Sequence, residues 1–132
     1  PEVKALMEAH PSEGVHYSAL IDRMDCAYAC ADLLLSRSGA SSISEICMAG
    51  KACIFVPSPN VAEDHQTHNA MALVNKGAAR IVKDSQAPKE LLKEATRLIH
   101  NAEELEDIEK KAFAMALPDA AHIIVDEAYK LI

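Results

Sequence analysis

The stretch Ala31-Asp-Leu-Leu-Leu-Ser-Arg-Ser-Gly-Ala-Ser-Ser-Ile-Ser-Glu45 decides the fold, because an apolar segment stops at a small-residue turn and a helix starts at once. The three leucines at positions 33–35 are typical of a strand that is buried on both faces of a sheet. Ser42 and Glu45 stand in the S-x-x-E register of a capping box, which predicts a helix that opens at Ser42. A strand, a glycine turn and a helix N-terminus leave backbone N–H groups unpaired at one place, where a phosphate can bind.

Segments with strand and helix patterns alternate on both sides of this stretch. Apolar, strand-like segments occupy residues 15–17, 33–36, 52–56 and 78–82. Helical patterns occupy residues 3–9, 22–31, 42–49, 65–76, 103–117 and 119–132, with another helix from Pro88 whose apolar face comprises Leu91, Leu92, Ala95, Leu98 and Ile99. Gly50 and Gly77 are expected to end the helices that precede two of the strands. This alternation predicts an α/β fold with a doubly wound parallel sheet.

Length and charge limit the classes of function. The chain has 132 residues, enough for one domain, and half of them are hydrophobic. Its formal charge of -7 repels nucleic-acid backbones and anionic membrane surfaces, so no nucleic-acid partner is expected. Neither an apolar run of about 20 residues nor a signal-peptide pattern is visible, which favours a cytosolic chain.

The four cysteines and the N-terminus lead to two further expectations. Cys26, Cys30, Cys47 and Cys53 form no C-x-x-C pair and lie in or beside apolar segments, so we expect reduced core residues. The chain enters in the middle of a helix with no preceding strand. We therefore expect residues 1–132 to be one partial domain, lacking the first strands of a longer protein.

Two readings fit the turn and the helix that follows it. Ser41, Ser42 and Glu45 can cap the helix for purely structural reasons. Alternatively, the remaining N–H groups bind a phosphate while the Glu45 carboxylate accepts hydrogen bonds from ribose hydroxyls, and both readings can hold together. Arg37 can pair with a phosphate or anchor the loop through a local carboxylate. The glycine-rich G-x-G-x-x-G pattern is absent.

A second polar cluster, residues 63–69, follows the strand at 52–56 and its proline loop. Gln66 and Asn69 lie one helical turn apart, so their amides share a face and are able to bind sugar hydroxyls. The alternative is a polar helix start with amide caps. His65 and His68 are compatible with a metal, but without a third ligand they do not define a zinc site, and no metal is predicted. No Ser-His-Asp or Cys-His arrangement is convincing in this sequence.

Several short motifs, in this order, resemble the C-terminal domain of the MurG family of bacterial glycosyltransferases. The matching segments are Ala31-Asp-Leu, Ser36-Arg-Ser-Gly-Ala40, Ser44-Glu-Ile46, Gly50-Lys51, Val56-Pro57, His65-Gln66, Asn69-Ala70, Leu73-Val74 and Gly77-Ala-Ala79. The resemblance covers the chain from about Val15 onward, and Ile21-Asp-Arg-Met24 is similar to the family's short segment ahead of a helix. It implies the Rossmann-like C-terminal half of a two-domain, GT-B type transferase that adds N-acetylglucosamine to a lipid-linked muramoyl-pentapeptide in peptidoglycan synthesis.

The resemblance also implies a donor site for UDP-N-acetylglucosamine, with no cofactor. Ile21 would hold uracil through its main chain, Glu45 would bind the ribose, and Gln66 would bind the sugar. The turn, comprising Ala40, Ser41, Ser42, Ile43 and Ser44, would meet the diphosphate and sugar. Additional contacts are expected from Arg37, Gly39, His65 and Asn69.

The family's Gly-Gly-Ser-Gln-Gly-Ala loop and its N-terminal domain, which carries a proposed histidine base, have no counterpart in these residues. No catalytic residue is therefore assigned here, and the lipid-linked acceptor would be reached through the N-terminal domain. The expected location is the cytoplasmic side of the inner membrane, as a peripheral protein. The alternatives are a non-catalytic donor-binding subunit of a split transferase and a relative that uses another UDP-sugar.

Overall fold

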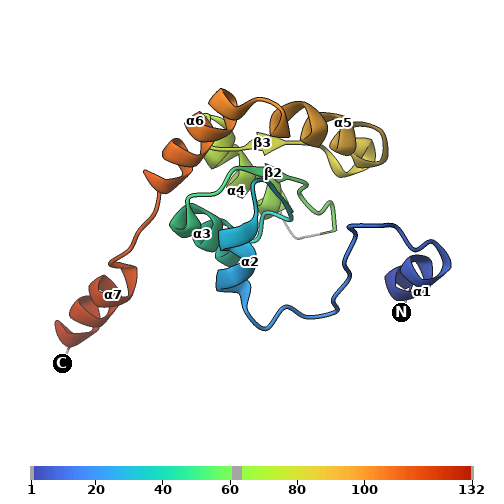
Figure 1. Cartoon of the computed structure of the whole chain (residues 1–132). Helices are drawn as coiled ribbons and strands as arrows, with labels where there is room; N and C mark the ends of the chain where they lie inside the picture. The colour runs from blue at the N-terminus through green and yellow to red at the C-terminus, as the bar shows by residue number, and fades with distance from the viewer. Residues whose placement is uncertain (1, 61–63, 132) are drawn as a thin grey trace.

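The centre of the molecule is a parallel sheet in which three strands are ordered β1-β2-β3. The computed structural model describes residues 2–60 and 64–131. The strands are β1 (Leu34–Ser36), β2 (Cys53–Phe55) and β3 (Arg80–Ile81). The helices are α1 (Glu2–Ala9), α2 (Met24–Cys30), α3 (Ala40–Ala49), α4 (His65–Val74), α5 (Ala87–Ile99), α6 (Ala102–Phe113) and α7 (Ala120–Tyr129), with a short 3-10 turn, η2, at Asp84–Gln86 (Figure 1).

Strand β2 is covered on both faces, which explains its continuous apolar sequence. Its side chains alternate, so Cys53 and Phe55 join a core built with α3 and α4. Ile54 faces the opposite core, where it meets Leu98 of α5 and Ile108 of α6. Figure 1 shows the same layers, with α5 and α6 on one side of the sheet and α2, α3 and α4 on the other. The predicted α/β fold with a parallel sheet is confirmed.

The predicted capping box is wrong. Helix α3 begins at Ala40 rather than at Ser42, its N-cap is Gly39, and no side chain of the described residues caps it. Ser42 is already the third helical residue, so it lies too far into the helix to serve as its N-cap. At the other end the prediction holds, because Gly50 has φ +60°, a left-handed conformation that favours glycine after a helix.

The predicted strand at residues 15–17 is also wrong. Val15 and Tyr17 lie in an extended segment between α1 and α2 and are 53% and 43% exposed. A β-branched and aromatic sequence forms a strand only when a neighbouring strand pairs with it. The leucines at positions 33–35 are less buried than their sequence predicts, for a related reason. In the described sheet β1 pairs with β2 alone, and Leu35 is 46% exposed instead of buried.

Two other predictions of burial need correction. Cys47 and Cys53 are buried as expected, but Cys26 and Cys30 on α2 are exposed, because this short helix packs beside α3 and leaves its outer surface open. On α5, Leu98 is buried, whereas Leu92 and Ile99 are exposed. Helix α5 therefore buries only part of the apolar face that its sequence predicts.

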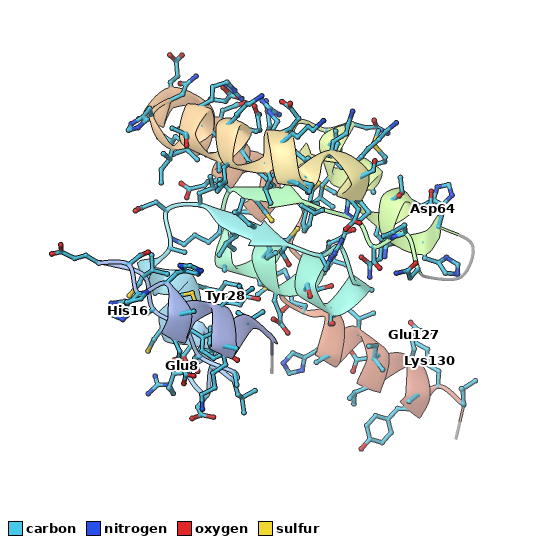
Figure 2. The ribbon with its side chains drawn as sticks, turned by 90° about the vertical axis from the view of Figure 1, so that its right-hand side faces the viewer. Glu8, His16, Tyr28, Asp64, Glu127 and Lys130 are labelled. Carbon is cyan, nitrogen blue, oxygen red and sulfur yellow. The ribbon has the colours of Figure 1, made fainter. Side chains whose placement is uncertain are left out.

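The first and last helices differ from the rest of the chain. Helix α7 has no buried residue, and the helices of the described chain include none with the length and hydrophobicity to span a membrane. On α7, Glu127 and Lys130 form an ion pair, and their side chains extend from the helix side by side in Figure 2. Helix α1 is joined to α2 by an irregular segment at residues 10–23, which contains a turn at Glu13 and Gly14. The elements that build the core therefore run from β1 to α6, with α2 packed against α3.

Candidate functional site

The N-terminus of α3 lies directly after the carboxyl end of β1 and is open to an anion. The first turn contains no acidic residue, and no side chain caps its N–H groups among the residues described. Gly39 has φ -65°, so its backbone does not require glycine, and an added Cβ would meet only Ser42 Oγ at 3.9 Å. The missing side chain instead leaves space above the helix. Because helix N-termini attract negative charge, this turn suits a phosphate better than the predicted capping box would have allowed.

Two amide side chains from α4 fix the loops around this turn. Asn69 Nδ2 donates to the carbonyl oxygen of Ser38 at 3.2 Å, and Gln66 Oε1 accepts from the backbone N–H of Ser58 at 2.9 Å. The first bond ties α4 to the loop after β1, and the second ties it to the loop after β2. Gln66 and Asn69 lie one turn apart on α4, as predicted. Each amide also forms a hydrogen bond with the backbone of a neighbouring loop.

Ser38 is a residue of the candidate site that no pattern in the sequence indicates. It is fully buried, and its hydroxyl donates to the carbonyl oxygen of Gln66 at 2.7 Å. Its own carbonyl oxygen accepts from Asn69, so one serine fixes the distance between the turn and α4. A serine between Arg37 and Gly39 in a turn predicts an exposed side chain, and only the packing of α4 against this loop reveals its role.

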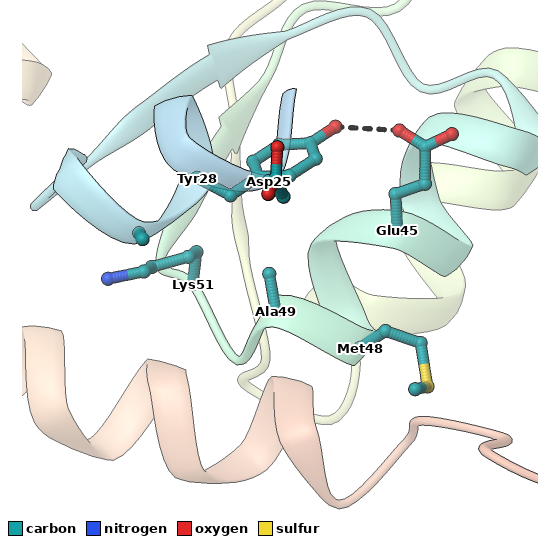
Figure 3. A pocket seen from close by; sticks show the side chains of 7 residues that line it. Asp25, Tyr28, Glu45, Met48, Ala49 and Lys51 are labelled. Carbon is teal, nitrogen blue, oxygen red and sulfur yellow. Dashed lines mark hydrogen bonds between the residues drawn. The ribbon is translucent and has the colours of Figure 1, made fainter. Parts of the chain in front are cut away.

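Glu45 lies farther along α3, and a side chain of the neighbouring helix α2 forms a hydrogen bond with it. Tyr28 of α2 donates its hydroxyl to Glu45 Oε2 at 2.8 Å (Figure 3). Burial of the ring, and then the hydrogen bond and charge of Glu45, raise the pKa of Tyr28 to about 12, so the phenol stays protonated at neutral pH. The two side chains border a cavity of about 400 Å³ between α2 and α3, with Asp25 and Lys51 also in its wall. This volume lies in the range of small-molecule pockets.

Arg37 forms hydrogen bonds and an ion pair within this chain. Its Nη1 donates to the carbonyl oxygens of Val56 and Pro57, at 2.9 and 3.2 Å, and it pairs with Asp84 of η2. Arg37 thus anchors the loop, as one of the two alternatives expected, but its carboxylate partner Asp84 lies 47 positions away and is not local in the sequence. A second cavity, of about 660 Å³, lies between η2 and the start of α4, and Asp84, Pro57 and Asp64 contribute to its wall.

The remaining predicted site residues are distributed unevenly around the turn. Ala40 and Ser41 are exposed in the first turn of α3, and Ser44 donates its hydroxyl back to the carbonyl oxygen of Ala40. Ile43 is partly buried and packs against the core. Ile21 is 49% exposed in the segment that leads to α2.

His65 is exposed at the first position of α4. Within residues 2–60 and 64–131, no group of three or more His, Cys, Asp or Glu side chains is arranged to hold a metal ion.

A parallel sheet with helices on both faces and a helix N-terminus at the carboxyl end of a strand places the chain in the class of Rossmann-like α/β domains. The chain belongs to glycosyltransferase family 28, because the model of that family's C-terminal domain matches residues 2–124. This assignment confirms the resemblance found in the sequence, including the Rossmann-like C-terminal half.

Relatives and a solved structure agree with this family. The chain is 50% identical over 120 residues to a UDP-N-acetylglucosamine--N-acetylmuramyl-(pentapeptide) pyrophosphoryl-undecaprenol N-acetylglucosamine transferase of Flavobacterium psychrophilum, covering 91% of the chain and 33% of the relative. It is 55% identical over 111 residues to the Bacteroides fragilis protein of the same name, covering 84% and 29%. The crystal structure of Acinetobacter baumannii MurG superposes with a TM-score of 0.85 at 34% identity, covering 98% of this chain and 38% of that one. The chain therefore spans about a third of the length of these relatives.

Proposed function

We propose that this chain is the donor-binding part of an inverting glycosyltransferase that moves N-acetylglucosamine from UDP-N-acetylglucosamine to a lipid-linked muramoyl-pentapeptide in peptidoglycan synthesis. The observation that carries this proposal is the 50% and 55% identity to transferases of that name, over 91% and 84% of the chain. The open N-terminus of α3 supports it, because a nucleotide diphosphate needs such an anion site.

The donor is proposed to lie across the turn after β1. Its diphosphate would meet the N–H groups of Ala40, Ser41 and Ser42, where Gly39 leaves room. Its ribose would meet Glu45 at the cavity between α2 and α3, and the main chain of Ile21 would hold the uracil.

The sugar is proposed to lie toward the start of α4. Gln66 would bind it, with His65 and Asn69 as its neighbours, and the ties from α4 to Ser38 and Ser58 support this arrangement because they keep the two amides beside the turn. Arg37 would contribute to this edge through the loop that it anchors.

The chemistry of the transfer requires groups beyond those assigned here. An inverting transfer needs a base that removes the proton from the acceptor hydroxyl while the diphosphate leaves. No residue of this chain is assigned that role, and the lipid-linked acceptor is proposed to be bound by another domain, at the cytoplasmic side of the inner membrane. We therefore expect the purified 132 residues to bind the donor weakly and to transfer no sugar.

Titration calorimetry with UDP-N-acetylglucosamine, UDP-galactose and UDP tests the proposal. We expect all three to bind, because they share the nucleotide, with UDP-N-acetylglucosamine bound most tightly. Equal affinity for the two sugar nucleotides would contradict the assignment to N-acetylglucosamine and would favour a relative that uses another UDP-sugar. Absence of binding by UDP itself would contradict the donor site, and transfer of sugar by the isolated chain would contradict the division of roles.

The variant Gln66→Ala locates the sugar. Its affinity for UDP-N-acetylglucosamine should fall about fivefold, the effect of one lost hydrogen bond of roughly 1 kcal/mol, while its affinity for UDP stays within about twofold. Thr67→Ala, one position along α4, is the matched control. An equal loss for both ligands would indicate that Gln66 acts only by anchoring the loop at Ser58.

A further inference from the structure

We propose that Tyr28 is a positioning residue for ribose recognition, which holds one oxygen of Glu45 so that the other faces the ribose hydroxyls of the donor. This inference rests on the proposed function and adds to it a residue on a second helix. The two side chains are 17 positions apart in the sequence and meet only because α2 packs beside α3.

The ring and the hydroxyl of Tyr28 have separate tasks. The ring is partly buried and packs against the core formed by α3, α4 and β2, which fixes its orientation. The hydroxyl extends beyond that core and donates to Glu45 Oε2 at 2.8 Å. Figure 3 shows the Tyr28 hydroxyl aimed at one carboxylate oxygen of Glu45, while the other oxygen points away from the tyrosine. An anchored ring thus determines where an exposed carboxylate lies.

The direction of this hydrogen bond is fixed. An ionised carboxylate can only accept, and a phenol whose pKa is raised to about 12 can only donate to it at neutral pH. The bond therefore leaves the other oxygen, Oε1, as an acceptor whose position is set before any ligand arrives. Ribose hydroxyls are donors that match such an acceptor.

The gain from Tyr28 is preorganisation. Glutamate side chains are among those that lose the most rotamer freedom when they are fixed, and Glu45 is exposed on the surface of α3. A hydrogen bond that already orders Glu45 in the free protein reduces the entropy lost when the ligand binds. Deleting the hydroxyl should thus weaken binding even though Tyr28 itself does not touch the ribose.

The position of Tyr28 in the cavity fits this role. The cavity wall combines Asp25 and Tyr28 of α2 with Glu45 of α3, so both helices contribute to the same pocket. Helix α2 begins at Met24, three positions after Ile21, whose main chain is proposed to hold the uracil. The segment that approaches the base and the helix that orients Glu45 are therefore continuous in the chain.

Ribose analogues distinguish a positioning role from a merely structural one. The test compares the dissociation constants of UDP, 2′-deoxy-UDP and 3′-deoxy-UDP for the unmodified chain, Tyr28→Phe, Glu45→Gln and the double variant. Phenylalanine keeps the ring and removes only the hydroxyl. Tyr129→Phe on α7, where the tyrosine is 72% exposed, is the matched control.

We expect the unmodified chain to bind at least one deoxy analogue about tenfold more weakly than UDP. In Tyr28→Phe, the affinity for UDP should fall about fivefold, and the discrimination against that analogue should fall to within about twofold. Adding Tyr28→Phe to Glu45→Gln should change little, since both act through the same carboxylate, and Tyr129→Phe should match the unmodified chain.

Two results would overturn the inference in different ways. If Tyr28→Phe weakens UDP and both deoxy analogues by the same factor, the hydroxyl serves only to join α2 to α3, and the donor site itself still stands. If the unmodified chain binds no UDP at all, the proposed function fails, and the role assigned to Tyr28 fails with it.

Discussion

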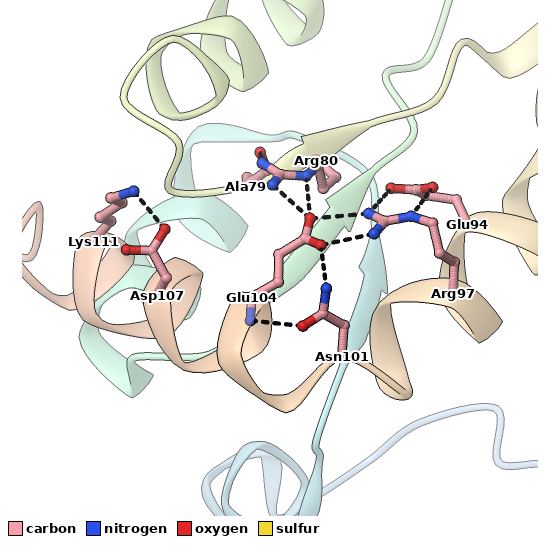
Figure 4. Close-up of polar contacts among 8 residues, drawn as sticks. All are labelled: Ala79, Arg80, Glu94, Arg97, Asn101, Glu104, Asp107 and Lys111. Atoms are coloured by element: carbon pink, nitrogen blue, oxygen red, sulfur yellow. Dashed lines mark hydrogen bonds and ion pairs between the residues drawn. The ribbon is translucent and has the colours of Figure 1, made fainter.

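Two glutamates on different helices show how a structural carboxylate differs from a candidate binding carboxylate. Glu104 lies in the first turn of α6, where both of its oxygens are used by this chain. Arg80 of β3 reaches Oε1 at 2.6 Å through Nη2, and Arg97 of α5 reaches Oε2 at 2.7 Å through Nη1. Figure 4 shows Glu104 between these two guanidinium groups, with Asn101 at its other side. This cluster joins three elements, and the two arginines already occupy both oxygens of Glu104.

Glu45 has the opposite surroundings. It is exposed, and its hydrogen bond with Tyr28 uses Oε2. The side chain of Glu104, in contrast, is 19% exposed. A carboxylate enclosed by two arginines stabilises the fold, whereas a carboxylate held at one oxygen beside a cavity is available to a ligand. Substitutions of the two glutamates should therefore differ in their effects on stability and on binding.

The largest effect is expected for Glu104→Gln. Glutamine keeps the shape but removes the charge, so Arg80 and Arg97 lose their shared partner, and the free energy of unfolding should fall by about 2 kcal/mol. Urea unfolding measures this change. The control is Glu106→Gln on the same helix, because Glu106 forms an exposed i,i+4 pair with Lys110 that should contribute little to stability. Equal losses in the two variants would contradict the structural role of Glu104.

A smaller effect should appear when the pH is lowered. The hydrogen bonds from Arg97, and then those from Arg80, lower the pKa of Glu104 from 4.5 to about 2 in the folded chain. The unfolded chain therefore binds a proton at a higher pH than the folded chain does. The stability that Glu104 contributes is fully present above about pH 5 and is lost as the pH falls toward 2.

Urea unfolding at pH 6 and pH 3 measures this contribution. Between these pH values the unmodified chain should lose about 1 kcal/mol more than Glu104→Gln, a figure that allows for the partial exposure of the group. A parallel fall in both proteins would show that other carboxylates determine the acid sensitivity.

The smallest effect on stability is expected for Glu45→Gln. Because Glu45 is exposed and does not cap its helix, the free energy of unfolding should change by no more than about 1 kcal/mol. Its affinity for UDP should nevertheless fall about tenfold, because a neutral amide is a weaker acceptor for ribose hydroxyls. Calorimetry and thermal unfolding on the same sample measure both quantities. A large fall in melting temperature with unchanged affinity would reverse the distinction between Glu45 and Glu104.

Local signals in the sequence predicted the elements better than their ends. Gly50 and the apolar strand at β2 were recognised correctly, because a left-handed C-terminal glycine and a strand buried on both faces have local signatures. The start of α3 was misplaced, since Ser42 and Glu45 have capping-box spacing at a point where the helix is already formed. Val15 and Tyr17 have strand-forming side chains, but they pair with no strand among the residues described.

The candidate site shows the same division. The spacing of Gln66 and Asn69 predicted two amides on one face of a helix, and the structure places them there. Their partners Ser38 and Ser58 come from other loops, and the partner of Arg37 is 47 positions away at Asp84. No pattern within one segment can predict such contacts, because they depend on how α4 and η2 pack against the ends of the strands.

The sequence by itself determined the parallel α/β fold, the glycine turn after β1 and the family to which the chain belongs, because these depend on periodicity and on short motifs within continuous segments. Only the tertiary structure decided which polar groups are already engaged. It enclosed Glu104 between Arg80 and Arg97, and it placed the Tyr28 hydroxyl on one oxygen of Glu45. The physical reason is that hydrogen bonds and ion pairs act over about 3 Å in space, regardless of how far apart their partners lie along the chain.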